Sequence, residues 1–565
     1  MENNLKDYIT KIVIHMCGIT ALFNAGLYKK EDIIESFKKG SVRGPEYTSC
    51  DILNGAFIGF HRLAINGLDD QSHQPINLNS KNVYLICNGE IYNWKALREI
   101  LSDEITYQTN SDCEIIIHLY EKYGIEHTLQ LLDGVFSFAL FDFENADCPK
   151  AYIARDTYGI RPLFVMNNGS DDAIGFCSEI KMLHDLNKYN TQTFTPFQPG
   201  YFMELQYDIT YSKWSISYSK QFSSPTSVTN PFIDSDNVLQ MIQTSLISAV
   251  QKRVDNTDRE IACLLSGGLD SSLITAIVAK LLDDPSKLNT WSIGMEGSED
   301  LMYARKVAEH IGTTHHEILL TENDFLDAIP DVIYAIESYD TTTVRASVGN
   351  WLISKFIRNN SNAKVVFNGD GSDELTGGYM YFHLAPNELE FDKECRRLLK
   401  DIHYFDVLRS DRSISNHGLE ARTPFLDRSF VSNYLSIPRE LRYHPKNNQP
   451  EKYLLRKAFD NTDLLPKSVL WRTKEAFSDG VSKQTRSWFE IIQEYAQQQV
   501  NEQDPKLAEK KWYKSLFDKF YPNCENVIPY FWMPKYVKAD DASARTLDVY
   551  KKNLEVDCSN NDSFA

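Results

Sequence analysis

The chain has 565 residues, several times the usual domain length of about 150, so two or three domains are expected. Its 42% hydrophobic and 24% charged residues exclude a disordered chain. The net charge of −19 argues against a surface for nucleic acid or anionic membranes and leaves small molecules as the expected partners. No apolar run is long enough to span a membrane, the first residues lack the basic character of a secretion signal, and the ten cysteines are scattered singly. These features predict a cytoplasmic protein without disulfides or a zinc site.

Short apolar runs broken by turn residues fill the chain from Cys17 to about Asp208. Such runs predict strands. One apolar stretch at 112–123 predicts a helix, with Asn110 or Ser111 as its N-cap. Residues 17–208 are therefore expected to form an α+β domain.

A linker is expected over 209–237, because its second half is rich in Ser, Thr, Asn and Pro. Helical patterns then alternate with short apolar strands, which predicts a parallel sheet with crossover helices over 238–540. The predicted strands of this sheet include 261–265, 289–295 and 364–369. Residues 541–565 are polar and are expected to form a frayed tail.

The string Ser266-Gly267-Gly268-Leu269-Asp270-Ser271-Ser272 joins a predicted strand to a predicted helix. Its backbone N–H groups, its hydroxyls and the positive end of the helix dipole would converge on an anion such as phosphate. Asp270 is suited to holding Mg²⁺ beside a pyrophosphate. The alternative is a sharp turn that two glycines permit. The whole string resembles the pyrophosphate-binding loop of ATP pyrophosphatases of the adenine-nucleotide hydrolase type.

Cys17 follows Met16 and precedes a predicted strand. A cysteine at an amino terminus carries a thiol nucleophile and an α-amine that can accept the thiol proton. With residues 1–16 attached, the nitrogen of Cys17 is an amide and cannot act as that base. We therefore expect this extension to be absent, through translation from Met16, or removed by cleavage. The alternative for Cys17 is a buried small residue in an edge strand.

Four strings accompany this cysteine: RGPE from Arg43, HRLAI from His61, NGEIYN from Asn88 and TNSDCE from Thr109. Together they resemble the glutaminase domain of the class II, N-terminal-nucleophile glutamine amidotransferases, which implies stacked antiparallel sheets between helices. The resemblance implies that Arg62 binds the glutamine α-carboxylate and that Glu90 and Asp112 receive its α-ammonium. It also implies that Asn88 and Gly89 form the oxyanion hole. Taken singly, these residues could be a surface ion pair, a helix-start carboxylate and a hairpin turn.

The amidotransferase strings and the phosphate loop in one chain resemble the glutamine-hydrolysing asparagine synthetases, from Cys17 to about residue 540. The segment ESYDTTTVRAS matches the aspartate segment of that family, with Thr342, Thr343 and Arg345 as implied ligands, although a threonine-capped helix start would look the same. Lys474 is the implied contact of the pyrophosphate. Leu265 and Ile293 are the implied neighbours of the adenine, for which core packing is the alternative.

An acidic loop departs from that family. Where the family reads S-G-E-G-S-D-E, this chain has Asn368-Gly369-Asp370-Gly371-Ser372-Asp373-Glu374. The resemblance implies that Asn368 and Gly369 contact the nucleotide, that Asp370 contacts the aspartate, and that Asp373 holds Mg²⁺ with Asp270. Asp370 loses about an ångström of reach, and misplacement on that scale can cost up to about 100-fold in rate.

The resemblance implies two half-reactions. Cys17 attacks the carboxamide of L-glutamine, ammonia leaves, and water releases glutamate from the thioester. The β-carboxylate of L-aspartate attacks the α-phosphorus of ATP, and ammonia that crosses through an internal tunnel converts the β-aspartyl-adenylate to asparagine and AMP. Family members are often dimers, so a homodimer is the corresponding expectation.

Three other functions stay open: a β-lactam synthetase-like adenylating enzyme, an ammonia-dependent synthetase with an idle glutaminase, and a non-enzymatic scaffold. The complete set of Cys17, Arg62, Asn88 and Asp112 argues against the first. The second follows if residues 1–16 stay attached to Cys17. The phosphate loop and the nucleophile argue against the third, because a scaffold needs neither.

Overall fold

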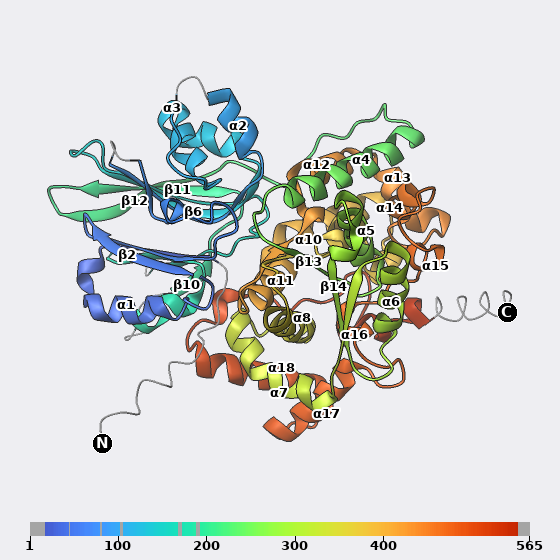
Figure 1. Ribbon diagram of the computed structural model, residues 1–565. Helices are drawn as coiled ribbons and strands as arrows, with labels where there is room; N and C mark the ends of the chain where they lie inside the picture. Colours follow the sequence, from blue (N-terminus) through green and yellow to red (C-terminus); the bar gives the residue numbers. More distant parts are fainter. Residues whose placement is uncertain are drawn as a thin grey trace, which may run out of the picture.

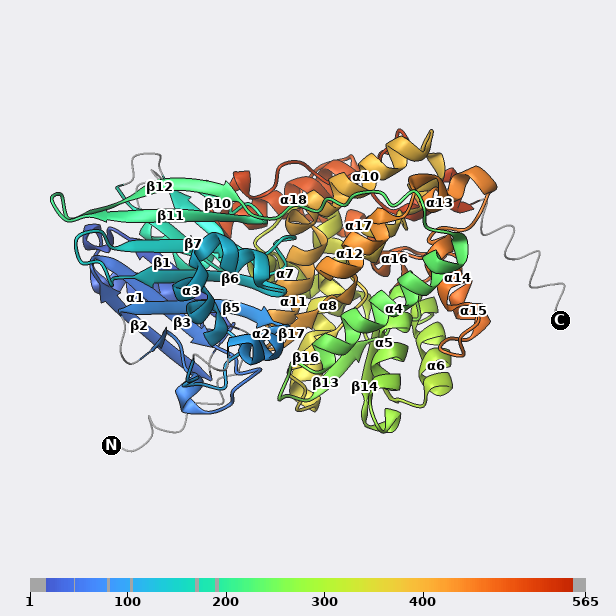
Figure 2. The same ribbon diagram turned by 90° about the horizontal axis from the view of Figure 1, so that it is seen from above.

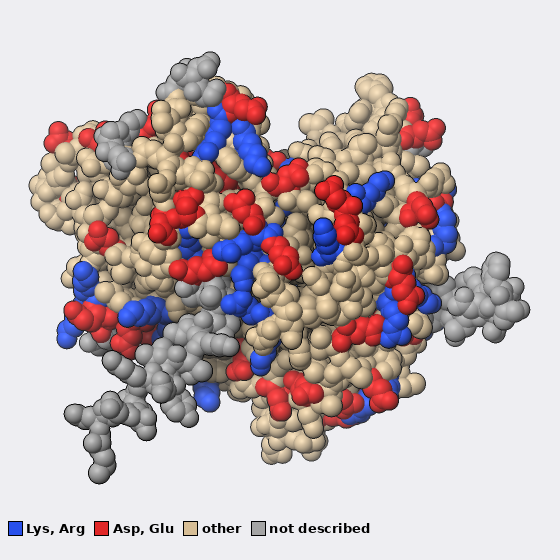
Figure 3. All heavy atoms as spheres, viewed as in Figure 1, with Lys and Arg blue, Asp and Glu red and all other residues tan. Residues whose placement is uncertain are grey.

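The computed structural model describes residues 17–44, 46–78, 82–101, 105–167, 172–187 and 193–551. Two lobes lie side by side, the first built from two stacked sheets and the second from one sheet wrapped in helices (Figure 1). Acidic and basic side chains are interspersed on the face shown in Figure 3. Every helix in the described part of the chain is too short or too polar to span a lipid bilayer. The predicted extension over 1–16 and residues 552–565 of the predicted tail lie outside the described residues.

Two six-stranded antiparallel sheets form the first lobe. The β1 sheet has the order β10-β8-β9-β1-β3-β2, and the β6 sheet has the order β12-β11-β7-β6-β5-β4. The strands of the β1 sheet are β1 (Gly18–Phe23), β2 (Tyr47–Leu53), β3 (Ala56–Arg62), β8 (Phe164–Asn167), β9 (Ile174–Cys177) and β10 (Thr193–Pro196). The strands of the β6 sheet are β4 (Ile76–Asn77), β5 (Val83–Ile91), β6 (Gly134–Asp142), β7 (Lys150–Arg155), β11 (Tyr201–Asp208) and β12 (Lys213–Gln221). The α-helices that the structure describes in this lobe are α1 (Lys30–Lys38), α2 (Trp94–Leu101) and α3 (Glu114–Leu131).

The side-chain alternation of the strands explains this stack. Ile19 and Phe23 of β1 pack against Phe141 of β6 between the two sheets. Leu22, on the opposite face of β1, joins the cluster that contains Phe37 of α1. Because both faces of each sheet carry apolar residues, each sheet is covered by its partner on one face and by helices on the other. The predicted α+β fold with stacked antiparallel sheets is confirmed.

Two details of the first lobe differ from the sequence prediction. The β6 sheet continues past the predicted boundary at Asp208, because β12, inside the predicted linker, pairs with β11 along its length. The helix predicted at 112–123 is α3, which begins two residues later and resumes beyond Gly124, whose φ of 73° kinks it. Asp112 lies before the helix, where its carboxylate accepts a hydrogen bond from the backbone N–H of Ile91 at 2.7 Å.

A five-stranded parallel sheet with the order β15-β14-β13-β16-β17 forms the centre of the second lobe. Its strands are β13 (Ile261–Leu264), β14 (Asn289–Gly294), β15 (Thr314–Leu319), β16 (Val365–Phe367) and β17 (Glu420–Arg422). The three predicted strands are β13, β14 and β16, so the expected parallel sheet is confirmed. The edge strands β15 and β17 were not predicted, because their sequences, THHEIL and EAR, are largely polar.

Helices cover both faces of this sheet (Figure 2). Cys263 packs in the cluster with α4, α5 and α6, and its neighbour Ala262 packs in the cluster with α7 and α8. The helices are α4 (Ser235–Val254), α5 (Leu269–Leu281), α6 (Glu299–Ile311), α7 (Glu322–Ile336), α8 (Thr341–Asn360), α9 (Ser372–Thr376), α10 (Glu388–Asp401), α11 (Asp406–Ser415), α12 (Arg428–Ser436), α13 (Arg439–Arg442), α14 (Tyr453–Phe459), α15 (Lys467–Leu470), α16 (Phe477–Gly480), α17 (Trp488–Val500) and α18 (Pro505–Phe520).

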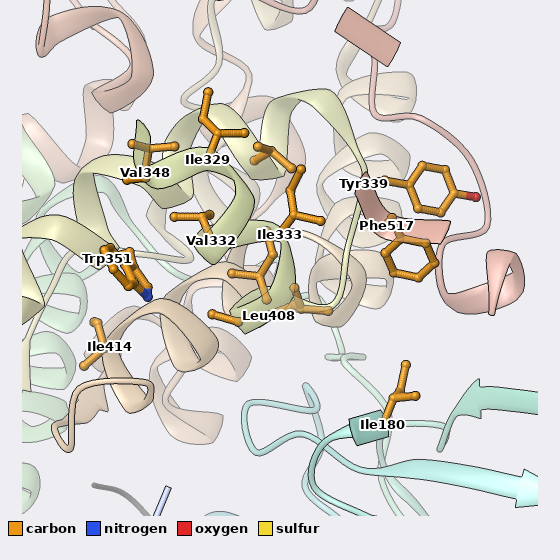
Figure 4. Close-up of a cluster of buried hydrophobic side chains, with 14 of the residues drawn as sticks. Ile180, Ile329, Val332, Ile333, Tyr339, Val348, Trp351, Leu408, Ile414 and Phe517 are labelled. Atoms are coloured by element: carbon orange, nitrogen blue, oxygen red, sulfur yellow. The ribbon is translucent and has the colours of Figure 1, made fainter. Parts of the chain in front are cut away.

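One hydrophobic cluster reaches from the second lobe into the first. Figure 4 shows Ile333 of α7 with Trp351 of α8 and Leu408 of α11, and Ile180 of the first lobe belongs to the same cluster. The lobes are therefore joined by a shared core as well as by the connecting chain.

The predicted frayed tail is packed as far as the described residues extend. Asp541 and Ser543 are buried, and Leu547 and Tyr550 join a cluster that contains Trp532. The prediction failed because long-range partners, both polar and apolar, hold this segment in place, and a local sequence pattern does not reveal them.

Candidate active sites

The first centre surrounds Cys17 at the head of β1. Its Sγ lies 3.3 Å from the backbone nitrogen and 3.2 Å from the carbonyl oxygen of Leu63. Arg43 donates from Nε to the carbonyl oxygen of Cys17 at 2.9 Å. Burial raises the pKa of the Cys17 thiol to about 12, so the thiol needs a base to become a nucleophile.

A buried pair of carboxylates, Glu90 and Asp112, lies in the same lobe. Burial raises the pKa of Asp112 to about 6, and burial together with Asp112 raises the pKa of Glu90 further above its usual value. The second lobe contributes to this pair, because Asn256, beyond α4, donates to Glu90 at 3.0 Å. The raised pKa values mean that ionisation of both groups is unfavourable. A bound cation such as an ammonium group would favour their ionised form.

The other predicted glutamine ligands lie around this centre. Arg62 is buried and donates to the carbonyl oxygens of Asp69 and Gly67. Asn88 is buried in β5, with Nδ2 lying 3.5 Å from Oγ of Ser178. Gly89 follows in the same strand, where an added Cβ would lie 2.2 Å from the carbonyl oxygen of Val135, so only glycine fits.

The second centre is a cavity at the carboxyl ends of β13, β14 and β16, where ligands bind in parallel sheets. Gly268 is the N-cap of α5, and the Oγ atoms of Ser266 and Ser271 lie 2.9 Å apart. The predicted residues that line this cavity are Leu265, Ser266, Gly268, Asp270, Ser271, Ile293, Thr342, Asn368, Gly369, Asp370, Asp373 and Lys474. Chain segments far apart in sequence therefore meet at one place.

Four predicted residues of this centre do not line the cavity: Gly267, Ser272, Thr343 and Arg345. Gly267 instead provides the tight turn, with a φ of 73° and no room for a Cβ beside Tyr303. Ser272 is buried inside α5, and the hydroxyl of Thr343 donates to Asp340 at the start of α8.

Arg345 also lies outside this cavity, and it is held by other residues. Its guanidinium makes four hydrogen bonds to the carboxylates of Glu509 and Asp541, which occupy four of its five N–H groups. The forked contact with a substrate carboxylate that the sequence suggested is therefore already made to the protein itself. The motif around Arg345 does not include Glu509 or Asp541, which lie far along the chain, so the sequence alone did not reveal these partners.

Two carboxylates and two ammonium groups form an ion cluster in the cavity. Lys452 lies 2.5 Å from Asp270 and 2.6 Å from Asp373, and Lys474 lies 2.8 Å from Asp373. Although burial acts against it, the two ammonium groups hold the pKa of Asp373 well below its usual range. Sequence reasoning missed Lys452, because it stands at the start of α14 in a stretch without a recognised motif.

The departing acidic loop is fitted to α11. Arg409 donates to Oδ1 of Asp370 at 2.9 Å, and Asn368 donates to the hydroxyl of Ser410 at 2.6 Å. Asp370 also donates from its backbone N–H to the side-chain oxygen of Asn368 at 3.2 Å. Burial raises the pKa of the Asp370 carboxyl group.

Helix α11 extends from one centre to the other. Asp411, two residues after Arg409, accepts a hydrogen bond at 2.9 Å from Arg43, whose guanidinium also binds the carbonyl oxygen of Cys17. The side chains of Arg43 and Asp411 are both buried.

The whole arrangement combines a buried thiol centre in stacked sheets with an anion-binding loop at the end of a parallel sheet. Comparison with known families gives both parts a match: residues 16–208 match the glutamine amidotransferase domain, and residues 241–391 and 384–540 match asparagine synthase. Relatives named "Asparagine synthetase [glutamine-hydrolyzing]" match nearly end to end. The Gallus gallus protein is 43% identical over 574 residues (96% of this chain, 100% of the relative), and the Homo sapiens protein is 42% identical over 573 residues (96% and 100%). The chain belongs to the family of glutamine-hydrolysing asparagine synthetases.

Proposed function

We propose that this chain synthesises L-asparagine from L-aspartate, ATP and the ammonia released from L-glutamine, giving L-glutamate, AMP and pyrophosphate. The observation that carries the proposal is the presence of two separate centres, one with a buried thiol and one with a phosphate loop, in a chain of this family.

In the glutaminase half-reaction, Cys17 attacks the carboxamide carbon, ammonia leaves from the tetrahedral intermediate, and water releases L-glutamate from the thioester that forms. Arg62 binds the α-carboxylate, and Glu90 and Asp112 bind the α-ammonium. The positive charge of the ammonium favours the ionised form of these two carboxyl groups, whose pKa values are raised. Asn88, with the backbone N–H of Gly89, stabilises the oxyanion. The α-amine of Cys17, once it is the first residue, accepts the thiol proton.

In the synthetase half-reaction, the aspartate β-carboxylate attacks the α-phosphorus of ATP. The loop at Ser266 binds the pyrophosphate, and Lys474 and Lys452 offset the charge that grows on this leaving group. Thr342 has a buried hydroxyl without a hydrogen-bond partner among the described residues, which makes it available to substrate. Ammonia then attacks the β-aspartyl-adenylate, with Asp370 as the carboxylate that orients the amine.

Mg²⁺ fits the second centre. Among the described residues no group of three or more His, Cys, Asp or Glu side chains could hold a metal ion. Mg²⁺ is commonly held by one or two carboxylates together with substrate phosphates, and Asp270 and Asp373 supply two. When bound, Mg²⁺ would neutralise charge on the pyrophosphate. A homodimer in the cytoplasm completes the proposal, on the family resemblance.

Exchange of labelled pyrophosphate into ATP tests this function. With L-aspartate present, the protein should exchange label, and adding ammonia should yield asparagine with AMP. A β-lactam synthetase-like enzyme would require a different carboxylic acid, and a scaffold would exchange nothing. Failure of aspartate to support exchange in a folded protein would overturn the proposal.

A further inference from the structure

A segment near the carboxyl end grips the outside of the nucleotide cavity. We name residues 541–550 the strap and residues 472–480 the cavity segment. Most of the cavity segment, residues 472–478, lines the cavity, whereas none of the strap does. Residues 473–476 belong to no helix or strand, so backbone pairing does not fix the position of Lys474.

Side chains of the strap hold the cavity segment. Arg545 donates from Nε to Oε1 of Glu475 at 2.8 Å, and the hydroxyl of Tyr550 donates to the other carboxylate oxygen. Ser543 lies 2.9 Å from both carboxylate oxygens of Asp479. The side chains of Arg545 and Glu475 are only 7% and 6% exposed, so this pair lies largely out of water.

The strap itself is anchored in the folded lobe at two points. Asp541 is bound by Arg345 of α8 at 2.8 Å, and Arg545 donates to the carbonyl oxygen of Lys483 at 2.9 Å. The strap is therefore a fixed support, and Glu475 is tied to it immediately beside Lys474.

Neighbouring residues of the cavity segment bind in two directions. Lys474 binds Asp373, inside the cavity, while Glu475 binds the strap. Removing Arg545 would leave the largely buried Glu475 carboxylate without its guanidinium partner, which is costly. The segment would shift to hydrate that carboxylate or to give it another cation, and Lys474 would move with it.

We propose that Arg545 is a positioning residue for the synthetase reaction: by holding Glu475 from outside the cavity, it fixes Lys474 where the pyrophosphate leaves. This inference rests on the proposed function. Because it concerns only the second centre, it implies that glutamine hydrolysis does not depend on Arg545.

Arg545→Met tests the role of Arg545. We expect its kcat for ammonia-dependent asparagine synthesis and its pyrophosphate exchange rate to fall by about 10- to 100-fold, the cost of a misplaced catalytic group. The KM for aspartate and the kcat of glutamine hydrolysis should stay within about twofold of the unaltered protein. Arg545→Lys keeps the charge and should recover part of the lost rate. Arg305→Met, which removes an exposed pair with Glu317, is the matched control and should change neither activity.

A double variant tests whether Arg545 acts through Lys474. In a Lys474→Met background, adding Arg545→Met should lower the residual exchange rate by less than about twofold, because groups that act as a unit are not additive. Full additivity, unchanged synthesis in Arg545→Met, or parallel loss of glutamine hydrolysis would each overturn the inference. If Arg545→Met does not fold, Glu475→Gln breaks the same ion pair with little change of shape and carries the same expectations. Absence of exchange in the unaltered protein would instead overturn the proposed function.

Discussion

The two centres differ in how the fold assembles them and in the charge they carry. In the first lobe, Asn88, Gly89 and Glu90 are consecutive residues of one strand, and the thiol nearby is held neutral by burial. In the second lobe, Ser266, Thr342 and Lys474 come from separate segments and line a cavity with paired ions. The thiol nucleophile, which must lose a proton, thus lies in surroundings that keep it neutral. The pyrophosphate leaving group, which carries several charges, instead leaves from a cavity that contains ammonium groups.

The largest expected effect separates the two chemistries. Cys17→Ala should lower glutamine-dependent asparagine synthesis by at least about 10³-fold, because no other group replaces the nucleophile. Synthesis with ammonia should stay within about twofold, since the thiol does not line the nucleotide cavity. Steady-state assays with each nitrogen source measure both rates. Equal loss with ammonia, in a folded variant, would show that the centres do not divide the work.

The amino terminus tests how the thiol loses its proton. Protein that begins at Cys17 should hydrolyse glutamine, while protein that retains residues 1–16 should be slower by at least about 100-fold, because its Cys17 nitrogen is an amide. Mass spectrometry of each sample establishes its first residue. Equal hydrolysis by both forms would mean that another group acts as the base.

Asp270→Asn should affect only the second centre. Removing this carboxylate, which binds Lys452 and is a proposed Mg²⁺ ligand, should slow synthesis with either nitrogen source by about 100-fold. Glutamine hydrolysis should continue at its usual rate. A variant that synthesises asparagine normally would show that Asp270 has no role in the reaction.

The pH dependence of glutamine hydrolysis tests the first centre more gently. Asp112 has a pKa of about 6, so below that pH its carboxyl group becomes neutral and loses attraction for the α-ammonium. We expect kcat/KM for glutamine to fall about tenfold per pH unit on the acid side, because this ratio reports the free enzyme. Asp112→Asn should give a low value and shift the acid limb to lower pH, because it removes the carboxylate charge that raises the pKa of Glu90. The same acid limb in Asp112→Asn would assign the titration to another group.

The smallest effect concerns the departing loop. Asp370→Glu restores the family's longer side chain, but Asp370 already lies 2.9 Å from Arg409. The extra methylene should therefore disturb this contact and lower the rate of synthesis by about three- to tenfold. Asn368→Ser in the same protein should recover part of the loss, because Asn368 holds the loop to α11. An increase in turnover with Asp370→Glu alone would show that the shorter residue limits the enzyme.

Contiguous motifs predicted many of the residues that line the cavity, and distant partners explain the residues that the motifs missed. The loop at Ser266 and the acidic loop at Asp370 were found because each lies next to a predicted strand, and strand ends of a parallel sheet converge. Lys452 comes just before α14 and Arg409 lies in α11, both in stretches without a distinctive string, so only the folded chain brings them to the cavity. Arg345 was recognised by its string, but the residues that bind it lie far along the chain.

The fold class was predictable for a similar reason. Alternation and short apolar runs depend on which faces are buried, which the sequence records directly. The packing of residues 541–551 depends on individual ion pairs and apolar contacts with remote segments, and no periodicity records those.

The hydrogen bond from Asn256 to Glu90 limits how freely the two lobes could be recombined. A first lobe transplanted onto a different synthetase would bring its cysteine, its strands and Glu90, but it would leave behind the amide that supports this carboxylate. The glutamine centre is thus completed by a residue from the neighbouring lobe. Any chimaera that keeps both activities has to exchange the surface between the lobes along with the lobe itself.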